Sequence, residues 1–126
     1  MAVMLELRAT LSANPEQVAE ARRLVAGYLA ERGDDDGEVA VLLTSELVTN
    51  AILYGRAPLE LRAQADGAAL RVEVHDLDPT SPPVLRHDVD LTEIGGRGLQ
   101  LVDTLADRWG WAKHDYGKVV WFELDA

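Results

Sequence analysis

The sequence contains no cysteine. A disulfide framework, a thiolate zinc site and a thiol nucleophile are therefore excluded, which agrees with a cytoplasmic protein. No apolar run approaches the roughly 18 residues that a membrane-spanning helix needs. Residues 1–10 also lack a basic region followed by an apolar block, so we expect neither a signal peptide nor a membrane partner.

Positive charge is also scarce. The chain has 22 acidic residues against 12 lysines and arginines, and its formal net charge is −10. Binding to duplex DNA normally requires a basic surface that releases counterions, so we expect no direct nucleic-acid partner. An acidic surface instead favours a basic protein partner. A chain of 126 residues fits one domain with one core, spanning residues 1–126.

Hydrophobic periodicity predicts a strand, two helices, a hairpin, an irregular segment, a short helix and a second hairpin. Asp66-Gly67 lies between two alternating strands and predicts a type I′ turn. This order predicts an α+β two-layer sandwich, with a mixed, mostly antiparallel sheet and helices on one face. The predicted strands are 3–10, 59–65, 68–75, 108–114 and 118–124, and the predicted helices are 15–32, 37–54 and 98–106.

Two polar residues, Glu46 and Asn50, lie four positions apart in the second predicted helix. Positions i and i+4 share a helix face, so both side chains point the same way. Taken alone, Glu-x-x-x-Asn is more often a solvated helix face than a site. The pair lies next to an apolar stripe formed by Val39, Leu42, Leu43, Leu47 and Ala51.

Two further features follow downstream. Asp76 ends a predicted strand, where a carboxylate can accept hydrogen bonds from a ligand amine. The glycine-rich segment 95–99 enters a helix, and a helix N-terminus offers free N–H groups to a phosphate. Each feature alone is more often a turn. Residues 76–97 are expected to form a long irregular segment, which in a compact domain is usually functional or mobile.

Other common sites are not supported. Gly117-Lys118 lacks the upstream glycine and the following Ser or Thr of a Walker motif. The three histidines lack zinc-ligand spacing, and Ser45 lacks the glycine context of a hydrolase nucleophile.

The ordered set of motifs resembles the ATPase/kinase superfamily with the Bergerat (histidine kinase-like ATPase) fold, which joins gyrase B, Hsp90, histidine kinases and MutL. Within it, the short single-domain layout looks most like the anti-sigma-factor serine/threonine kinases and their actinobacterial ATP-binding relatives. The resemblance covers essentially the whole chain. It rests on Ser45-Glu46-Leu47-Val48-Thr49-Asn50-Ala51, Asp76, Gly96-Arg97-Gly98-Leu99, Ala106-Asp107-Arg108-Trp109-Gly110 and Gly117-Lys118-Val119-Val120-Trp121.

The resemblance implies a role for each polar residue. Asn50 would hold a Mg²⁺ ion that bridges the ATP phosphates, as a hard oxygen ligand. Glu46 would orient or deprotonate the attacking hydroxyl. Asp76 would accept a hydrogen bond from the adenine amino group.

The same resemblance assigns the glycine-rich segment to ATP binding. Gly95, Gly96 and Gly98 would wrap the phosphates as part of a lid, and Arg97 would add positive charge. The helix that starts near Leu99 would direct its N-terminus at the phosphates.

Three positions depart from the family pattern. Asp78 replaces a frequent glycine, and Tyr54 replaces a frequent histidine after the Asn-Ala pair. Val119 stands where a threonine often supports adenine through water.

The resemblance implies an ATP-binding kinase that acts as an anti-sigma factor. Such a protein binds a sigma factor and phosphorylates a hydroxyl of an anti-anti-sigma (STAS-type) partner. The alternative is a catalytically inactive module that sequesters a regulator. A homodimer is compatible with either function.

Overall fold

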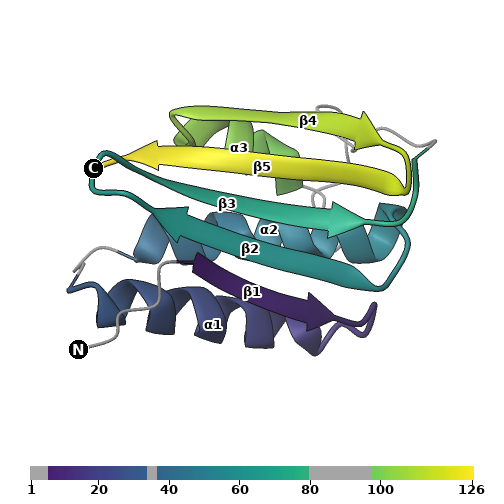
Figure 1. Ribbon diagram of the computed structural model, residues 1–126, viewed down its shortest axis with the longest axis horizontal. Helices are drawn as coiled ribbons and strands as arrows, with labels where there is room; N and C mark the ends of the chain where they lie inside the picture. The colour runs from purple at the N-terminus through teal and green to yellow at the C-terminus, as the bar shows by residue number, and fades with distance from the viewer. Residues whose placement is uncertain (1–5, 34–36, 80–97) are drawn as a thin grey trace.

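The computed structural model describes residues 6–33, 37–79 and 98–126 (Figure 1). The predicted phosphate-binding residues Gly95, Gly96 and Arg97 lie outside the described residues. The same applies to most of the irregular segment and to the first residues of the predicted N-terminal strand.

One five-stranded sheet forms the front layer of the molecule in Figure 1, with strand order β1-β2-β3-β5-β4. Every pairing is antiparallel, so within the described residues the sheet has no parallel pair. Two hairpins, β2–β3 and β4–β5, account for most of the sheet, and β1 is added at one edge. The strands are β1 (Glu6–Leu11), β2 (Leu59–Ala65), β3 (Ala69–Asp76), β4 (Arg108–His114) and β5 (Gly117–Asp125).

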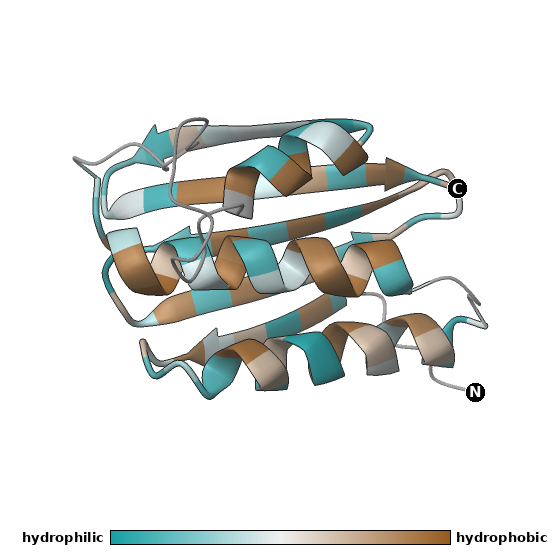
Figure 2. Ribbon diagram, turned by 180° about the vertical axis from the view of Figure 1, so that it is seen from behind, coloured by the Kyte–Doolittle hydropathy of each residue, from teal (hydrophilic) through white to brown (hydrophobic). Residues whose placement is uncertain are grey.

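In the described residues, three helices cover one face of this sheet and no helix lies on the other (Figures 1 and 2). They are α1 (Gln17–Glu31), α2 (Glu38–Tyr54) and α3 (Gly98–Leu105). The central helix α2 lies between α1 and α3 (Figure 2). Among the described helices, none is long and apolar enough to cross a membrane.

The core lies between the helices and the sheet. Alternation along the strands turns Val72, Val74 and Phe122 toward the helices, and each is at most 1% exposed. Helical spacing places Leu43 and Val48 of α2 against them, also fully buried. Each such side chain contributes about 1.5–3 kcal/mol through burial, which fixes α2 firmly on the sheet.

The elements confirm the predicted α+β fold, with helices and strands within a few residues of the predicted limits. One residue of the predicted apolar stripe is misplaced, because Leu42 is 39% exposed. It lies two positions from Ala40 and from Thr44, which are both buried. Two positions correspond to roughly 200° around a helix, so Leu42 points outward.

The predicted type I′ turn at Asp66-Gly67 is wrong. That turn needs positive φ at both central residues. Gly67 has a φ of 92°, but no described non-glycine residue has a positive φ. The carboxylate of Asp66 instead accepts hydrogen bonds from the N–H groups of Ala68 and Ala69, and these bonds lower its pKa.

Candidate functional site

Asp76 lies at one end of the fold, where α2 and β3 end and β5 begins (Figure 1), whereas Glu46 lies in the middle of α2. Asp76 is the last residue of β3, and its cross-strand neighbour is Lys118 of β5. The N–H group of Leu77 donates to the carbonyl oxygen of Arg56 at 2.8 Å. This bond ties the chain after α2 to the chain after β3, so the two ends are held together.

Glu46 and Asn50 lie on successive turns of α2, as predicted. Asn50 is only 5% exposed, whereas Glu46 is half-buried. The simple interpretation of the pair as a solvated helix face is therefore wrong for Asn50. Ser45 beside them donates its hydroxyl to the carbonyl oxygen of Leu42 at 2.8 Å, an interaction within the helix.

The Asp76 carboxylate is paired with an ammonium group. The Nζ atom of Lys118 lies 2.9 Å from Oδ2 and 3.2 Å from Oδ1 of Asp76. The two side chains are 2% and 1% exposed, respectively. The N–H group of Asp78 also donates to Oδ1 at 2.7 Å, and the carbonyl oxygen of Asp78 lies 3.5 Å from the Lys118 Nζ atom. The carboxylate at this end of the sheet is therefore fixed by three contacts.

Two glycines allow the surrounding backbone to approach Asp76. A Cβ atom at Gly117 would lie 1.8 Å from the Asp76 carbonyl oxygen. A Cβ atom at Gly55, the residue after α2, would lie 2.6 Å from Asp76 Oδ2 and 2.7 Å from the carbonyl oxygen of Ala51. Neither position has room for a side chain, so both glycines are needed for this packing.

The start of α3 contains the other described residues of the predicted site. The Leu99 side chain is 1% exposed and belongs to the core, so only its backbone is suited to contact a ligand. Gly98 is the first residue of α3, which begins on the side of the molecule where β3 ends (Figure 2). A helix N-terminus there is consistent with the predicted phosphate contact.

Sequence reasoning missed Lys118. It is one of only two lysines, and the antiparallel register of β3 with β5 sets it opposite Asp76. Only the register of β3 with β5 brings this cation directly opposite the strand-ending carboxylate, so the sequence alone offered no such signal. By the resemblance, Val119 stands where a threonine often supports adenine. It is the cross-strand neighbour of His75, so its side chain lies on the face of the sheet opposite to that of Asp76 and Lys118.

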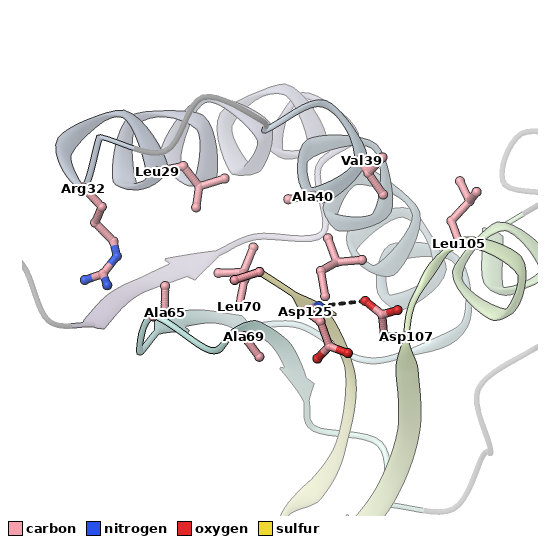
Figure 3. A pocket seen from close by; sticks show the side chains of 13 residues that line it. Leu29, Arg32, Val39, Ala40, Ala65, Ala69, Leu70, Leu105, Asp107 and Asp125 are labelled. Atoms are coloured by element: carbon pink, nitrogen blue, oxygen red, sulfur yellow. Dashed lines mark hydrogen bonds between the residues drawn. The ribbon is translucent and has the colours of Figure 1, made fainter.

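A pocket of about 520 Å³ lies at the other end of the molecule (Figure 3). Leu29, Val39 and Leu70 supply apolar lining, and the Asp107 carboxylate accepts a hydrogen bond from the Asp125 N–H group at 2.7 Å. No predicted site residue lines this pocket, so it is separate from the candidate site.

Comparison with known proteins gives a family and a fold. The family model described as histidine kinase-like ATPase domain matches residues 11–124. The RsbU and RsbW domains of Rv1364c from Mycobacterium tuberculosis superpose with a TM-score of 0.72 at 22% identity, over 96% of this chain and 32% of that chain. The histidine kinase domain of a blue-light activated histidine kinase from Erythrobacter litoralis gives a TM-score of 0.50 at 22% identity, over 85% of this chain and 59% of that chain. At these identities the likeness shows the fold alone.

A sequence relative is an uncharacterized protein of Streptomyces coelicolor. It is 50% identical over 40 residues, which is 32% of this chain and 38% of that protein. The matches therefore span only about two fifths of this relative and about a third of the mycobacterial chain.

Proposed function

This chain belongs to the histidine kinase-like ATPase family, and from that premise we propose that it transfers the γ-phosphoryl group of ATP to a serine or threonine hydroxyl of a protein partner. The family description implies that ATP is bound. The observation that carries the finer proposal is the order of polar groups along α2. Asp76 lies against Gly55 at the end of the helix. Asn50 and Glu46 lie about 7.5 and 13.5 Å further back along its axis, at 1.5 Å per residue.

This order matches the layout of a nucleotide placed along the helix. The base would lie by Asp76, the phosphates would lie by Asn50, and the acceptor hydroxyl would lie by Glu46. A carboxylate can accept the exocyclic amine of adenine, and the start of α3 offers N–H groups to the phosphates.

The donor set fits a magnesium ion that arrives with the nucleotide. Among the described residues, no group of three or more His, Asp or Glu side chains could hold a metal ion. Mg²⁺ is commonly held by one or two protein oxygens together with phosphates and waters, and the carboxamide oxygen of Asn50 is such a ligand. When bound, the ion would neutralise phosphate charge.

The transfer step assigns the proton to Glu46. The hydroxyl oxygen of the partner forms a bond to the γ-phosphorus while the bond to the β,γ-bridging oxygen breaks, and ADP leaves. The hydroxyl proton passes to the Glu46 carboxylate, which is half-buried and so less solvated than a surface acid. Positioning and charge compensation account for most of the rate enhancement in such reactions.

The partners we propose are a sigma factor and a STAS-type anti-anti-sigma protein that carries the acceptor hydroxyl. The support is the resemblance in sequence to anti-sigma-factor kinases, together with the fold shared with the RsbU and RsbW domains of Rv1364c. An acidic chain of net charge −10 also suits a basic partner surface.

The test is transfer of label from γ-³²P-ATP with Mg²⁺ to purified STAS-domain proteins. We expect wild type to label one of them on Ser or Thr, and Glu46→Gln to bind ATP without transferring label. Binding of ATP without transfer to any member of the panel would contradict the kinase proposal. That outcome would favour the alternative, a module that sequesters its partner without catalysis.

A further inference from the structure

The Asp76–Lys118 pair is the least exposed ion pair in the described part of the chain. A buried pair of this kind stabilises a fold little, because desolvation of both charges offsets their attraction. The same position filled by two apolar residues would serve the core as well. Its presence in the buried layer between the helices and the sheet therefore points to a requirement for the carboxylate itself.

Contacts among the described residues fill three of the acceptor positions on Asp76. A carboxylate has about four lone-pair positions. On Oδ1 they receive the Asp78 N–H group at 2.7 Å and the Lys118 ammonium at 3.2 Å. On Oδ2 one receives Lys118 at 2.9 Å. No described residue donates to the second position on Oδ2. This oxygen lies next to Gly55, the residue that follows α2.

Lys118 reaches Asp76 because of its place in β5. It follows Gly117, whose missing side chain lets β5 pass directly against the Asp76 backbone. The other lysine, Lys113, is its cross-strand neighbour on β4 and is exposed to solvent. The two lysines thus share a hairpin, and in the described residues only Lys118 contacts the carboxylate.

We propose that Lys118 is a positioning residue for the nucleotide base: it compensates the charge of Asp76 and orients the carboxylate so that Oδ2 accepts the 6-amino group of adenine. The inference rests on the proposed ATP-binding function, in which Asp76 is the base acceptor. Without Lys118, a buried carboxylate lacks its counter-charge, and its orientation is set by the Asp78 N–H group alone.

The test compares ATP with purine riboside triphosphate, which lacks the 6-amino group. Calorimetric affinities for both nucleotides are measured in wild type, Lys118→Met and the matched control Lys113→Met. We expect wild type and the control to prefer ATP by about 10- to 100-fold, as one hydrogen bond to a charged acceptor provides. In Lys118→Met the preference should fall to near one, with affinity for the analogue nearly unchanged.

A purely structural role for Lys118 gives a different result, because both affinities would then fall together and the preference would persist. That result overturns the inference, while ATP binding by the wild-type protein still supports the proposed function. Absence of ATP binding by wild type instead contradicts the proposed function, and the inference falls with it. The two failures are therefore distinguishable.

A second measurement uses wild type alone, in case Lys118→Met does not fold. Selective ¹⁵N labelling of lysine gives two side-chain signals, and Lys113 serves as an internal control. We expect ATP to shift the Lys118 ammonium signal and the analogue to leave it unchanged. Equal shifts with both nucleotides, or no shift with bound ATP, overturn the inference.

Discussion

Glu46 and Asn50 occupy the same face of α2 but differ in exposure, and this difference separates their proposed roles. Asn50 is 5% exposed, which suits a ligand whose oxygen must be fixed before the nucleotide arrives. Glu46 is half-buried, so a hydroxyl from a partner protein can reach it. One residue is thus suited to binding and the other to transfer.

Substitutions at these two positions should therefore have different effects. Asn50→Ala should weaken Mg-ATP binding by at least tenfold, because a hydrogen bond or ligand contact to a charged group is worth about 1.5–3 kcal/mol. Glu46→Gln should retain ATP affinity within about twofold and lose phosphoryl transfer by about 100-fold or more, the usual contribution of a general base. Calorimetry and a transfer assay measure the two effects. Equal loss of affinity in both variants would contradict the division of roles.

The residues of the site could be predicted from sequence only in part. Glu46 and Asn50 follow from spacing along one helix, which is a local property. Lys118 could not be placed with the same ease, because its contact with Asp76 depends on the register between two strands that are 42 residues apart in sequence. The face of the sheet on which Val119 lies depends on the same register, since a shift of one residue reverses the side chain.

At the scale of elements, the site depends on how closely β5 and the end of α2 approach β3. Gly117 and Gly55 are the residues at those two contacts, and a Cβ atom at either would overlap Asp76. From the sequence, the glycines before α3 were expected to contact the phosphates. In the described residues, Gly55 and Gly117 are the glycines that position Asp76.

Alanine substitution should change the free energy of unfolding differently at a glycine that has no room for a Cβ atom and at one that has room. Gly117→Ala should lower the free energy of unfolding by at least about 1–3 kcal/mol, because its Cβ atom would force backbone movement. Gly27→Ala in α1, an exposed helical position with nothing within 4 Å, should raise that free energy by about 0.5–1 kcal/mol. Urea unfolding measures both values. Equal stability of the two variants would show that β5 does not pass as closely as described.

The helix-free face of the sheet carries a network of ion pairs. The carboxylate of Glu123 on β5 accepts hydrogen bonds from Arg108 of β4 at 2.7 Å and from Arg71 of β3 at 3.0 Å. The hydrogen bond from Arg108, followed by that from Arg71, lowers the pKa of Glu123. Arg71 also lies over the ring of Trp121, with its guanidinium carbon 4.2 Å from the ring centroid. The network links three neighbouring strands.

Acid should weaken this network. A carboxylate whose pKa is lowered on folding stabilises the fold above its unfolded value of about 4.3, and the contribution is lost as pH falls through the lower, folded value. Glu123→Gln should therefore destabilise the protein by about 1 kcal/mol or less at pH near 7 and by less than that at pH near 3. Denaturant unfolding at both pH values measures this.

The matched control is Asp115→Asn. Asp115 lies at the exposed tip of the β4–β5 hairpin, and its substitution should change stability little at either pH. A Glu123→Gln effect that is the same at neutral and acidic pH would show that the carboxylate charge does not contribute.

At the scale of the whole molecule, the fold class was predictable because it follows from periodicity. Alternation in β2 and β3 and helical spacing in α2 each specify one buried face, and burying these faces together requires helices packed on a sheet. The strand order was not predictable in the same way. Insertion of β5 between β3 and β4 depends on long-range pairing, which local patterns do not encode.

The composition also sets limits on the whole chain. A net charge of −10 means that binding of an anionic nucleotide depends on local donors rather than on the overall field. The start of α3 offers such donors in the described residues. In the proposed function, a nucleotide binds at one end of the sheet and a protein partner binds elsewhere.

The most direct test of the central claim is calorimetric titration of the wild-type protein with Mg-ATP. The account predicts saturable heat with one nucleotide bound per chain at or below millimolar concentration. An absence of heat at millimolar Mg-ATP, with a folded protein confirmed by circular dichroism, would contradict it.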